Sequence, residues 1–378
     1  MKNIFLEIFK VFMNFIYLIF KLQPIKNKVV MLTRQSNKPF VDFKLLEEEF
    51  IKQNIEVVML CKKIEKGFLN KVKYFFHLIE SLYHLASSKY CIVDGYSICV
   101  SMLNHKKELQ IMQIWHALGA IKKFGYQILD YEEGRSKETA TNLQMHKNYT
   151  YVTCCSEETK KFYQEAFNIK ENQVKVLGMP RVDYLKNLEK NFNKEIYKDY
   201  PKLKKKKNIV YVPTFRKKQR VEFEELVHLI DKEKYNLIIR LHPLDKNIIE
   251  SEFEIDKKYF TYDILAIADY VITDYSAVAI EASILNIPVF FYLYDYEKYK
   301  NKRGLNINLE DEVPSFIGFN AQEIIDKIEN ENYEIEELVE FQKKYVETID
   351  MDNTKNIVDL LVGGRVDEYI KKENHRLV

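Results

Sequence analysis

The sequence predicts an α/β protein made of two lobes, each with a parallel sheet, preceded by an amphipathic helix. A chain of 378 residues is longer than one hydrophobic core usually organises. From Lys28 onward, short β-branched runs alternate with helical segments, which is the pattern of βαβ units. A polar segment with the lysine run 204–207 interrupts this alternation once, and we place the lobe boundary there. The expected parts are residues 1–27, 28–196 and 207–378.

The composition indicates a globular protein and gives no reason to expect a nucleic acid as its partner. Apolar residues make up 47% of the chain and charged residues 30%, which is ordinary for a folded domain. The net charge of +2 provides no overall attraction to a phosphate backbone. The five cysteines include no C-x-x-C pair, and their odd number favours reduced thiols in a cytosolic protein.

No cofactor and no metal are expected. The chain has neither the G-x-x-x-x-G-K-[ST] phosphate loop nor a G-x-S-x-G turn. Asp350-Met351-Asp352 has the D-x-D form that metal-dependent glycosyltransferases use. It stands between expected C-terminal helices, however, so we interpret it as turn and capping chemistry.

The first expected part, residues 1–27, contains a strongly apolar helix from Ile4 to Leu22. Its polar residues recur at helical spacing and form one stripe on an otherwise apolar surface. A transmembrane span would carry such charges at high cost, whereas a helix in the plane of the membrane interface accommodates them. The alternative is a helix packed on the body of the protein. The stripe consists of Glu7, Lys10, Asn14 and Lys21.

In the first lobe, His116 follows an apolar run that reads as a strand, so it should stand at a strand's carboxyl end. A histidine near neutral pH is suited to accept a proton from an attacking hydroxyl. The alternative is a core histidine bonded to a backbone carbonyl. The expected strands of this lobe are 29–32, 57–60, 91–93, 111–115, 151–153 and 174–176.

In the second lobe, polar residues follow three expected strands, which cover 209–212, 237–241 and 270–272. The carboxyl ends of parallel strands share one edge of the sheet, so these polar groups should meet. Arginines, a histidine, hydroxyls and a helix N-terminus together suit a diphosphate. Ser276 is expected to cap the helix 277–285. The polar residues are Thr214 with Arg216, Arg240 with His242, and Asp274 with Ser276.

The motifs then point to a family. Their order is W-H-A-x-G-A-x-K-x-F-G from Trp115, L-G-M-P-R-x-D, P-T-F-R, R-x-H-P, D-Y-V-I-T-D-Y-S and E-A-S-I-x-x-x-P-V-F-F-Y. This order resembles the CDP-glycerol glycerophosphotransferase family, the teichoic acid priming and polymerising enzymes. The resemblance spans roughly Val29 to Gly304. Some members of the family read H-G-T-P-L-K where this chain has His116 to Lys122, and D-Y-S-S where this chain has Ala277.

The resemblance implies a GT-B-like fold, with two Rossmann-like lobes facing a cleft, and peripheral attachment to the cytoplasmic face of the membrane. The implied reaction transfers glycerol phosphate from CDP-glycerol to a hydroxyl of a polyprenyl-diphosphate-linked acceptor and releases CMP. His116 would be the base and His242 would contact the donor's phosphates. The donor-binding residues would be Thr214, Arg216, Arg240, Asp274, Tyr275, Ser276 and, at the ribose, Glu281. The acceptor or phosphate side would hold Lys122, Lys123 and Arg181.

Other functions remain compatible with the motifs. The donor could be CDP-ribitol or another CDP-polyol, and the product could be a capsule polymer. A glycosyltransferase or a sugar-nucleotide epimerase of the same fold is a second enzyme class. A catalytically inactive, membrane-bound scaffold is a third possibility. Because the chain has little beyond the two lobes and the helix, addition of one or a few units is expected rather than long-chain polymerisation.

Overall fold

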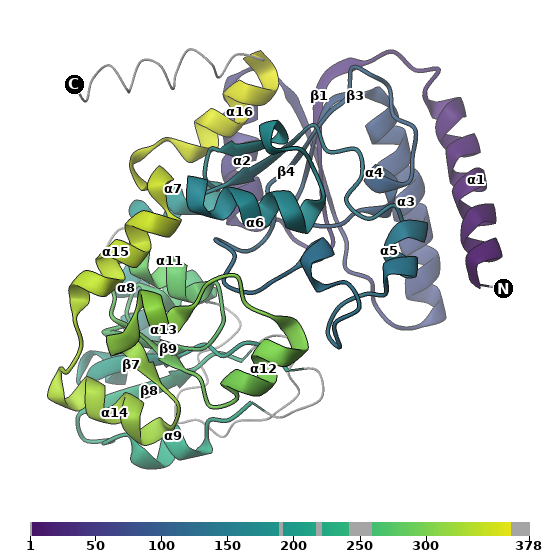
Figure 1. Ribbon diagram of the computed structural model, residues 1–378. Coiled ribbons are helices and arrows are strands. Elements are labelled where there is room, and N and C mark those ends of the chain that lie inside the picture. The colour runs from purple at the N-terminus through teal and green to yellow at the C-terminus, as the bar shows by residue number, and fades with distance from the viewer. Residues whose placement is uncertain (1, 189–191, 217–220, 242–258, 364–378) are drawn as a thin grey trace. The chain divides into compact units, whose positions relative to one another are not determined.

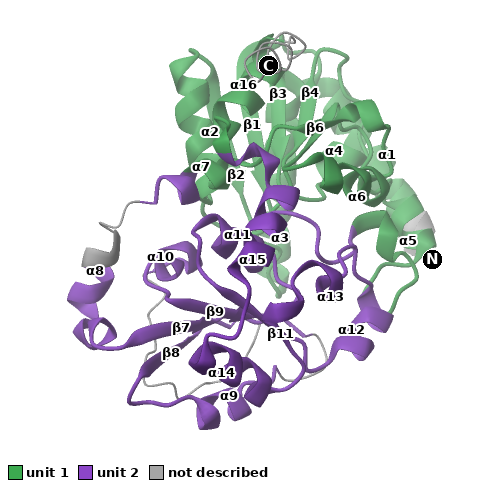
Figure 2. Ribbon diagram, turned by 60° about the vertical axis from the view of Figure 1, so that its left-hand side comes forward, with its two compact units in different colours: residues 1–116, 125–183, 350–378 green, residues 117–124, 184–349 purple. Residues whose placement is uncertain are grey.

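The structure is a computed structural model that describes residues 2–188, 192–216, 221–241 and 259–363. The chain forms two compact units, which Figure 2 shows in separate colours. Unit 1 contains Met1–His116, Gly125–Asp183 and Asp350–Val378, and unit 2 contains Ala117–Phe124 and Tyr184–Ile349. The chain therefore enters unit 2 directly after His116, returns at Gly125, and crosses again at Asp183.

These units correct the expected lobe boundaries in two places. The second crossing lies at Asp183 rather than in the lysine-rich segment, and the C-terminal helix α16 (Asn353–Gly363) belongs to unit 1. The cause is burial: Ile357 and Val358 of α16 pack in one core cluster with Phe43 of α2. The C-terminal helix closes the first core and not the second.

Unit 1 contains a parallel sheet with the strand order β2-β1-β3-β4-β5-β6. Each expected strand is present, although the one expected at 111–115 already ends at Gln113. The register pairs Val30 of β1 with Val58 of β2 and with Cys91 of β3. From β1 the chain proceeds to β2 on one side and then to β3 on the other, so β1 and β3 flank the topological switch point. In open α/β sheets this is where ligands bind. The strands are β1 (Lys26–Thr33), β2 (Glu56–Cys61), β3 (Ser88–Val93), β4 (Gln110–Gln113), β5 (Tyr151–Cys154) and β6 (Val174–Val176).

Helices accompany this sheet as crossover connections (Figure 1). The longest is α3 (Phe68–Ser87), which leads from β2 into β3 and turns Leu78, Leu82 and Leu85 into the protein. The other helices are α1 (Lys2–Phe20), α2 (Val41–Lys52), α4 (Ile98–Ser101), α5 (Lys137–Asn142), α6 (Glu157–Phe167) and α7 (Pro180–Lys186), with 3₁₀ turns at Gly125–Ile128 and Glu171–Gln173.

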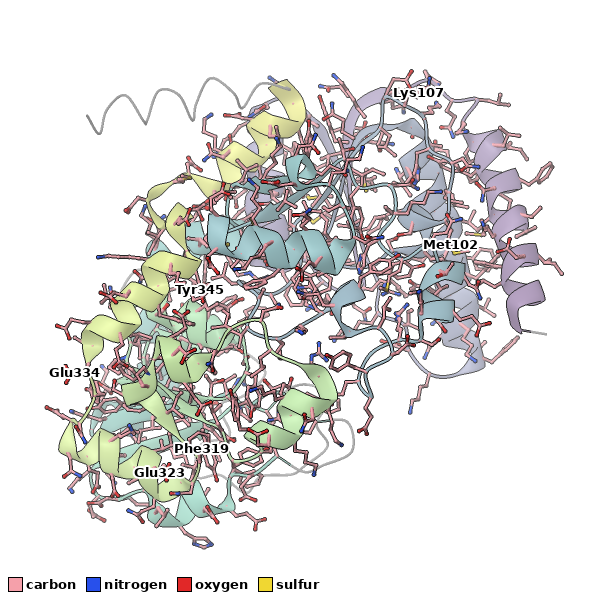
Figure 3. The ribbon with its side chains drawn as sticks, in the orientation of Figure 1. Met102, Lys107, Phe319, Glu323, Glu334 and Tyr345 are labelled. Carbon is pink, nitrogen blue, oxygen red and sulfur yellow. The ribbon has the colours of Figure 1, made fainter. Side chains whose placement is uncertain are left out.

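Helix α1 packs on the body of the protein, which is one of the two alternatives drawn from its sequence. It packs on unit 1 through buried Met13 and Tyr17, and Asn14 donates to the carbonyl oxygen of Met102, which Figure 3 labels. Much of the polar stripe thus faces loops of the protein, while apolar side chains face outward. No helix in the described ranges is long and apolar enough to cross a bilayer. The exposed apolar residues of α1 and the turn after it are Ile8, Val11, Phe12, Phe15, Leu18, Ile19 and Leu22.

Unit 2 contains a second parallel sheet, with the strand order β11-β10-β9-β7-β8. Here β7 pairs with β8 on one side and β9 on the other, so its switch point lies between β7 and β9. The three expected strands of this lobe are present, and those expected at 209–212 and 237–241 begin two residues earlier than expected. The strands of unit 2 are β7 (Lys207–Tyr211), β8 (Tyr235–Ile239), β9 (Tyr270–Thr273), β10 (Val289–Tyr292) and β11 (Ile317–Gly318).

The helices of unit 2 include α11, which begins one residue later than expected. It spans Val278–Ile284, and Ala277 already has helical backbone angles at the cap position. The other helices are α8 (Phe192–Asp199), α9 (Glu224–Leu229), α10 (Thr261–Leu265), α12 (Tyr296–Arg303), α13 (Leu309–Glu312), α14 (Ala321–Asn330) and α15 (Ile335–Tyr345), with 3₁₀ turns at Pro201–Lys204, Pro314–Phe316 and Glu347–Asp350.

The segment Ala117–Phe124 packs tightly within unit 2. Lys122 forms an antiparallel bridge with Leu305, and Asn306 donates its N–H to the carbonyl of Ile121. Gly119 has a φ of +67°, and a Cβ at this position would lie 2.2 Å from the Ile280 side chain of α11. Glycine is therefore required here both for the backbone angle and for the close approach.

Candidate functional site

His116 stands after β4 with its ring half-buried, and its Nδ1 is hydrogen-bonded to the backbone. Nδ1 lies 2.8 Å from the carbonyl oxygen of Asp94, which can only accept a hydrogen bond. Nδ1 must therefore carry the proton, and Nε2 carries the lone pair. A longer contact of 3.4 Å joins Nδ1 to the amide nitrogen of Gln35, and the shorter bond decides the tautomer. The backbone bond expected of a core histidine thus coexists with a nitrogen suited to accept a proton.

The backbone that presents His116 is strained. Trp115 has a φ of +59°, a conformation that bulky L-residues rarely adopt and that costs on the order of 1–3 kcal/mol. Its N–H donates to the side chain of Gln113 at 2.8 Å, and buried Gln113 donates in turn to the carbonyl of Gly95. The Trp115 and His116 rings lie 4.1 Å apart. Several bonds therefore hold this turn in one unusual conformation, as is common at functional sites.

Arg181 supports the same turn from the opposite direction. Its Nη1 donates to the carbonyl oxygen of His116 at 3.2 Å, and its Nη2 pairs with Asp42 Oδ2 at 2.6 Å. Both partners are buried, with Arg181 only 7% exposed. Arg181 was expected on the acceptor or phosphate side. The structure shows its guanidinium in an ion pair with Asp42 and in a hydrogen bond to the backbone of His116.

Asp94, whose backbone carbonyl accepts from His116, has a buried carboxyl group. Thr33 Oγ1 donates to this carboxyl at 2.5 Å. Burial raises the pKa of Asp94 to about 7, although the bond from Thr33 opposes the shift. The residue thus combines a carbonyl that orients His116 with a carboxyl group that is neutral or charged near physiological pH.

In unit 2, the residues expected at the ends of β7 and β9 do meet at the switch point. The Thr214 N–H donates to both carboxylate oxygens of Asp274, at 2.9 Å and 3.1 Å, and the Tyr275 N–H donates to Oδ1 at 2.6 Å. Asp274 is fully buried, so it ties the two loops together from within. Lys122 Nζ lies 3.4 Å from Thr214 Oγ1, and both side chains remain partly exposed.

Arg216 is buried and stabilises the loops at this edge of the unit 2 sheet. It pairs with Asp274 at 3.0 Å and with Asp295 at 2.9 Å, and its guanidinium lies 4.6 Å from the Tyr299 ring centre. Burial opposes its charge, but Asp274 and Asp295 outweigh that effect and raise its pKa. Tyr275 is also fully buried and stacks on Tyr299 at 4.0 Å. These two side chains shape the loops that carry Thr214 and Ser276.

Ser276 stands just before α11, partly exposed, with Oγ 3.4 Å from the Val278 N–H. Glu281 is buried, at 3% exposed, and accepts a hydrogen bond from Tyr262 at 2.9 Å. Arg240 is partly exposed and donates to the carbonyl of Tyr259 at 2.9 Å. Burial lowers the pKa of Arg240.

Two of the expected residues need separate comment. His242 lies outside the described residues. The side chain of Lys123 runs beside Gly304, where an added Cβ would lie 2.8 Å from the lysine Cδ. No group of three or more His, Cys, Asp or Glu in the described ranges is arranged to hold a metal ion.

Sequence reasoning did not single out Asp42, Asp94 or Asp295 as site residues. Asp94 and Asp295 both follow strands, so the rule that located Asp274 could have located them. Asp42 lies in the first turn of a helix and gives no such signal. Only the fold brings it to Arg181.

Comparison with known proteins identifies the family. Residues 15–363 match the family described as CDP-Glycerol:Poly(glycerophosphate) glycerophosphotransferase. The chain belongs to this family. This chain is 30% identical to the teichoic acid ribitol-phosphate primase of Bacillus spizizenii W23, and the alignment covers 89% of this chain and 90% of the relative. It is 32% identical to the teichoic acid glycerol-phosphate primase of Bacillus subtilis 168, over 82% and 86%.

A solved structure of the wall teichoic acid polymerase TagF matches the glycerophosphotransferase-family chain with a TM-score of 0.71. The match covers 98% of both chains at 20% identity, so it shows a common fold and nothing further. The expected α/β class with two parallel sheets, of GT-B-like type, is thereby confirmed.

Proposed function

We propose that this protein transfers a polyol phosphate, in the first instance glycerol phosphate, from a CDP-polyol to a hydroxyl of a polyprenyl-diphosphate-linked acceptor in teichoic acid synthesis. The observation that carries the proposal is the orientation of His116 by Asp94 in a chain of this family. The relatives named above are primases for ribitol phosphate and for glycerol phosphate.

The chemistry follows from the two clusters. The acceptor's hydroxyl oxygen attacks the phosphorus that bears the polyol, while Nε2 of His116 takes the hydroxyl proton. The new P–O bond forms as the bond to the bridging oxygen breaks, and CMP leaves with that electron pair. An alcohol is a poor nucleophile at neutral pH, and a positioned base typically contributes about 10²–10⁴-fold.

The leaving CMP gains negative charge, which fixed donors must stabilise. The partly exposed groups of unit 2 suited to this are Lys122, Thr214, Arg240 and Ser276, and we assign them to the donor's phosphates together with His242. The buried Arg216 and Asp274 hold these loops in place. We assign Glu281 to the ribose of the donor. Glu281 accepts a hydrogen bond from the Tyr262 hydroxyl, which connects it to that side.

The exposed apolar face of α1 supports attachment to a membrane surface. Val11 is 68% exposed and Phe15 is 63% exposed, although the helix is anchored to unit 1 through Tyr17 and Asn14. A helix that keeps its polar stripe on the protein and its apolar face outward suits the bilayer interface. The protein would bind its lipid-linked acceptor at this bilayer interface.

A second donor, CDP-ribitol, is favoured by the 30% identity to a ribitol-phosphate primase. The test is CMP release with CDP-glycerol and CDP-ribitol in parallel, on a lipid-linked disaccharide with and without one glycerol phosphate. Preference for CDP-glycerol supports the first proposal, and preference for CDP-ribitol replaces it with the second. Binding of CDP-glycerol without turnover on either acceptor would point to the scaffold. Product length on the same acceptors separates priming from polymerisation.

A further inference from the structure

A chain of buried side chains leads from the backbone next to His116 into the interior of unit 1. Gln113, the last residue of β4, accepts the Trp115 N–H at its Oε1, 2.8 Å away. Its Nε2 donates to the carbonyl oxygen of Gly95 at 3.1 Å and to the Tyr149 hydroxyl at 3.0 Å. Gln113 is fully buried and Tyr149 is 4% exposed. Both amide hydrogens of Gln113 are therefore used, which fixes the orientation of its side chain.

The bonds of Gln113 also set the direction of the next hydrogen bond in this chain. Because the Tyr149 oxygen accepts from Gln113, its O–H donates to His146 Nδ1, which lies 3.0 Å away. Burial lowers the pKa of His146 to about 3, and nearby positive charges, that of Arg135 first, lower it further. The His146 ring is therefore neutral at physiological pH, with its proton on Nε2 and its acceptor on Nδ1. This is the opposite tautomer to that of His116.

His146, at the far end of the chain, is itself fixed by packing. It is 4% exposed and has a φ of +60°. Its ring centre lies 4.8 Å from that of Phe167 and 6.2 Å from that of Trp115, both at steep angles. A side chain packed in this way cannot shift without displacing its aromatic neighbours. The hydrogen bonds that begin at the Trp115 N–H therefore end on a rigid acceptor.

The backbone of Trp115 needs such support. Its φ of +59° is unfavourable for a bulky residue, so the turn relaxes unless its bonds hold it. Removing the Tyr149 hydroxyl leaves an amide hydrogen of Gln113 and Nδ1 of His146 buried without a partner. Gln113 can then rotate to find another acceptor and release the Trp115 N–H. The direction of His116, the next residue, depends on that bond.

We propose that Gln113, Tyr149 and His146 are positioning residues, which hold the Trp115 backbone in its strained conformation and so keep His116 aligned to accept the acceptor's proton. This inference rests on the proposed function, because it states how the base of that reaction is held. The three residues act through the Trp115 backbone, so their loss should slow the chemical step and leave substrate binding unchanged. A displacement of a reacting group by about 1 Å can cost about 10²-fold in rate.

The test compares two tyrosines whose rings lie near His146. Tyr149→Phe removes the hydroxyl that connects Gln113 with His146. Tyr126→Phe is the matched control, because the Tyr126 ring centre lies 6.4 Å from that of His146 but its hydroxyl donates to the carbonyl of Met145 at 2.8 Å. For Tyr149→Phe we expect kcat to fall about tenfold or more, with both KM values within about twofold of wild type. For Tyr126→Phe we expect kcat and both KM values to match wild type, and urea unfolding checks that both variants are folded.

His146→Asn is the conservative variant. The asparagine oxygen stands where Nδ1 stands in histidine, and asparagine tolerates a positive φ, so kcat should stay within about threefold of wild type. A loss as large as that of Tyr149→Phe would show that the ring of His146, and not its acceptor, supports the turn.

Amide hydrogen exchange at Trp115 measures the same network without a substrate. Exchange should be about tenfold faster in Tyr149→Phe and unchanged in Tyr126→Phe. An unchanged kcat in folded Tyr149→Phe would overturn the positioning role, and so would an equal loss of kcat in both tyrosine variants or a raised acceptor KM with a normal kcat. If wild type transfers to no lipid-linked acceptor, the proposed function fails, and the exchange rates still decide whether this network holds the turn.

Discussion

The carbonyl oxygen of Asp94 accepts a hydrogen bond from His116 Nδ1 at 2.8 Å, and the carboxyl group of the same residue accepts one from Thr33 at 2.5 Å. One residue at the end of β3 thus fixes the tautomer of the proposed base through its backbone and carries a buried, titratable carboxyl group. Replacing the Asp94 side chain leaves the bond to His116 in place, since that bond uses the backbone. The two roles can therefore be tested separately.

His116→Ala should abolish transfer and leave donor binding intact. The donor cluster lies in unit 2, and the histidine contributes only proton acceptance, so kcat should fall about 10²–10⁴-fold. CMP release and calorimetry with CDP-glycerol measure the two effects. Near-normal turnover of the variant would eliminate His116 as the base.

Arg181→Lys should lower kcat about ten- to hundredfold without raising the KM of either substrate, because a small displacement of the base is costly. Lysine cannot reproduce the two-sided contact with Asp42 and the His116 carbonyl. Asp42→Asn should have a similar effect, and the double variant should be little worse than either single one. A raised acceptor KM that only Arg181→Lys shows would indicate direct contact with the acceptor.

Asp94→Asn should change how stability depends on pH. The folded protein raises the pKa of Asp94 to about 7, mainly through burial. Because the folded protein binds this proton more tightly than the unfolded chain does, the carboxyl group stabilises the fold at pH values below its pKa in the unfolded chain. That contribution is lost as pH rises through about 7. Between pH 5 and pH 8, the free energy of unfolding of wild type should fall by about 2–3 kcal/mol more than that of the variant. Urea unfolding at both pH values measures this difference, and parallel curves would contradict the assigned pKa.

Phe15→Glu should weaken binding to anionic phospholipid vesicles about tenfold or more, since it places a charge on the apolar face of α1. Phe319→Glu is the matched control, because Phe319, which Figure 3 labels, is 46% exposed but belongs to unit 2. Vesicle sedimentation with both variants gives the comparison. Equal loss in the two variants would show that the effect is charge alone and not the surface of α1.

Much of the fold follows from local sequence pattern. Runs such as Val29–Leu32 and Tyr270–Ile272 are β-branched or aromatic and bounded by polar residues, so the strands of both sheets are evident from the sequence. The meeting of Thr214 with Asp274 could also be predicted, because parallel strands end at one edge.

The roles of the arginines could not be predicted in the same way. Arg181 and Arg216 stand in motifs beside phosphate-binding candidates, yet both are neutralised by buried carboxylates. Asp42 and Asp295 are 139 and 79 residues away in sequence, and no local pattern connects them. The positive φ of Trp115 could not be predicted either, since it depends on the hydrogen bond that its N–H donates to Gln113 and on the bond from Arg181 to the His116 carbonyl.

Helix α16 has a consequence for how the protein is synthesised. Its residues Ile357 and Leu361 complete the core that Val29 and Phe43 begin, and Asp183 caps its first turn by accepting from Asn353 and Thr354. A ribosome makes the whole of unit 2 before these residues emerge, and domains generally fold as their chains are completed. The core of unit 1 therefore stays incomplete, with one face of α2 uncovered, while unit 2 is synthesised. The first unit to be translated is thus the last that can finish folding.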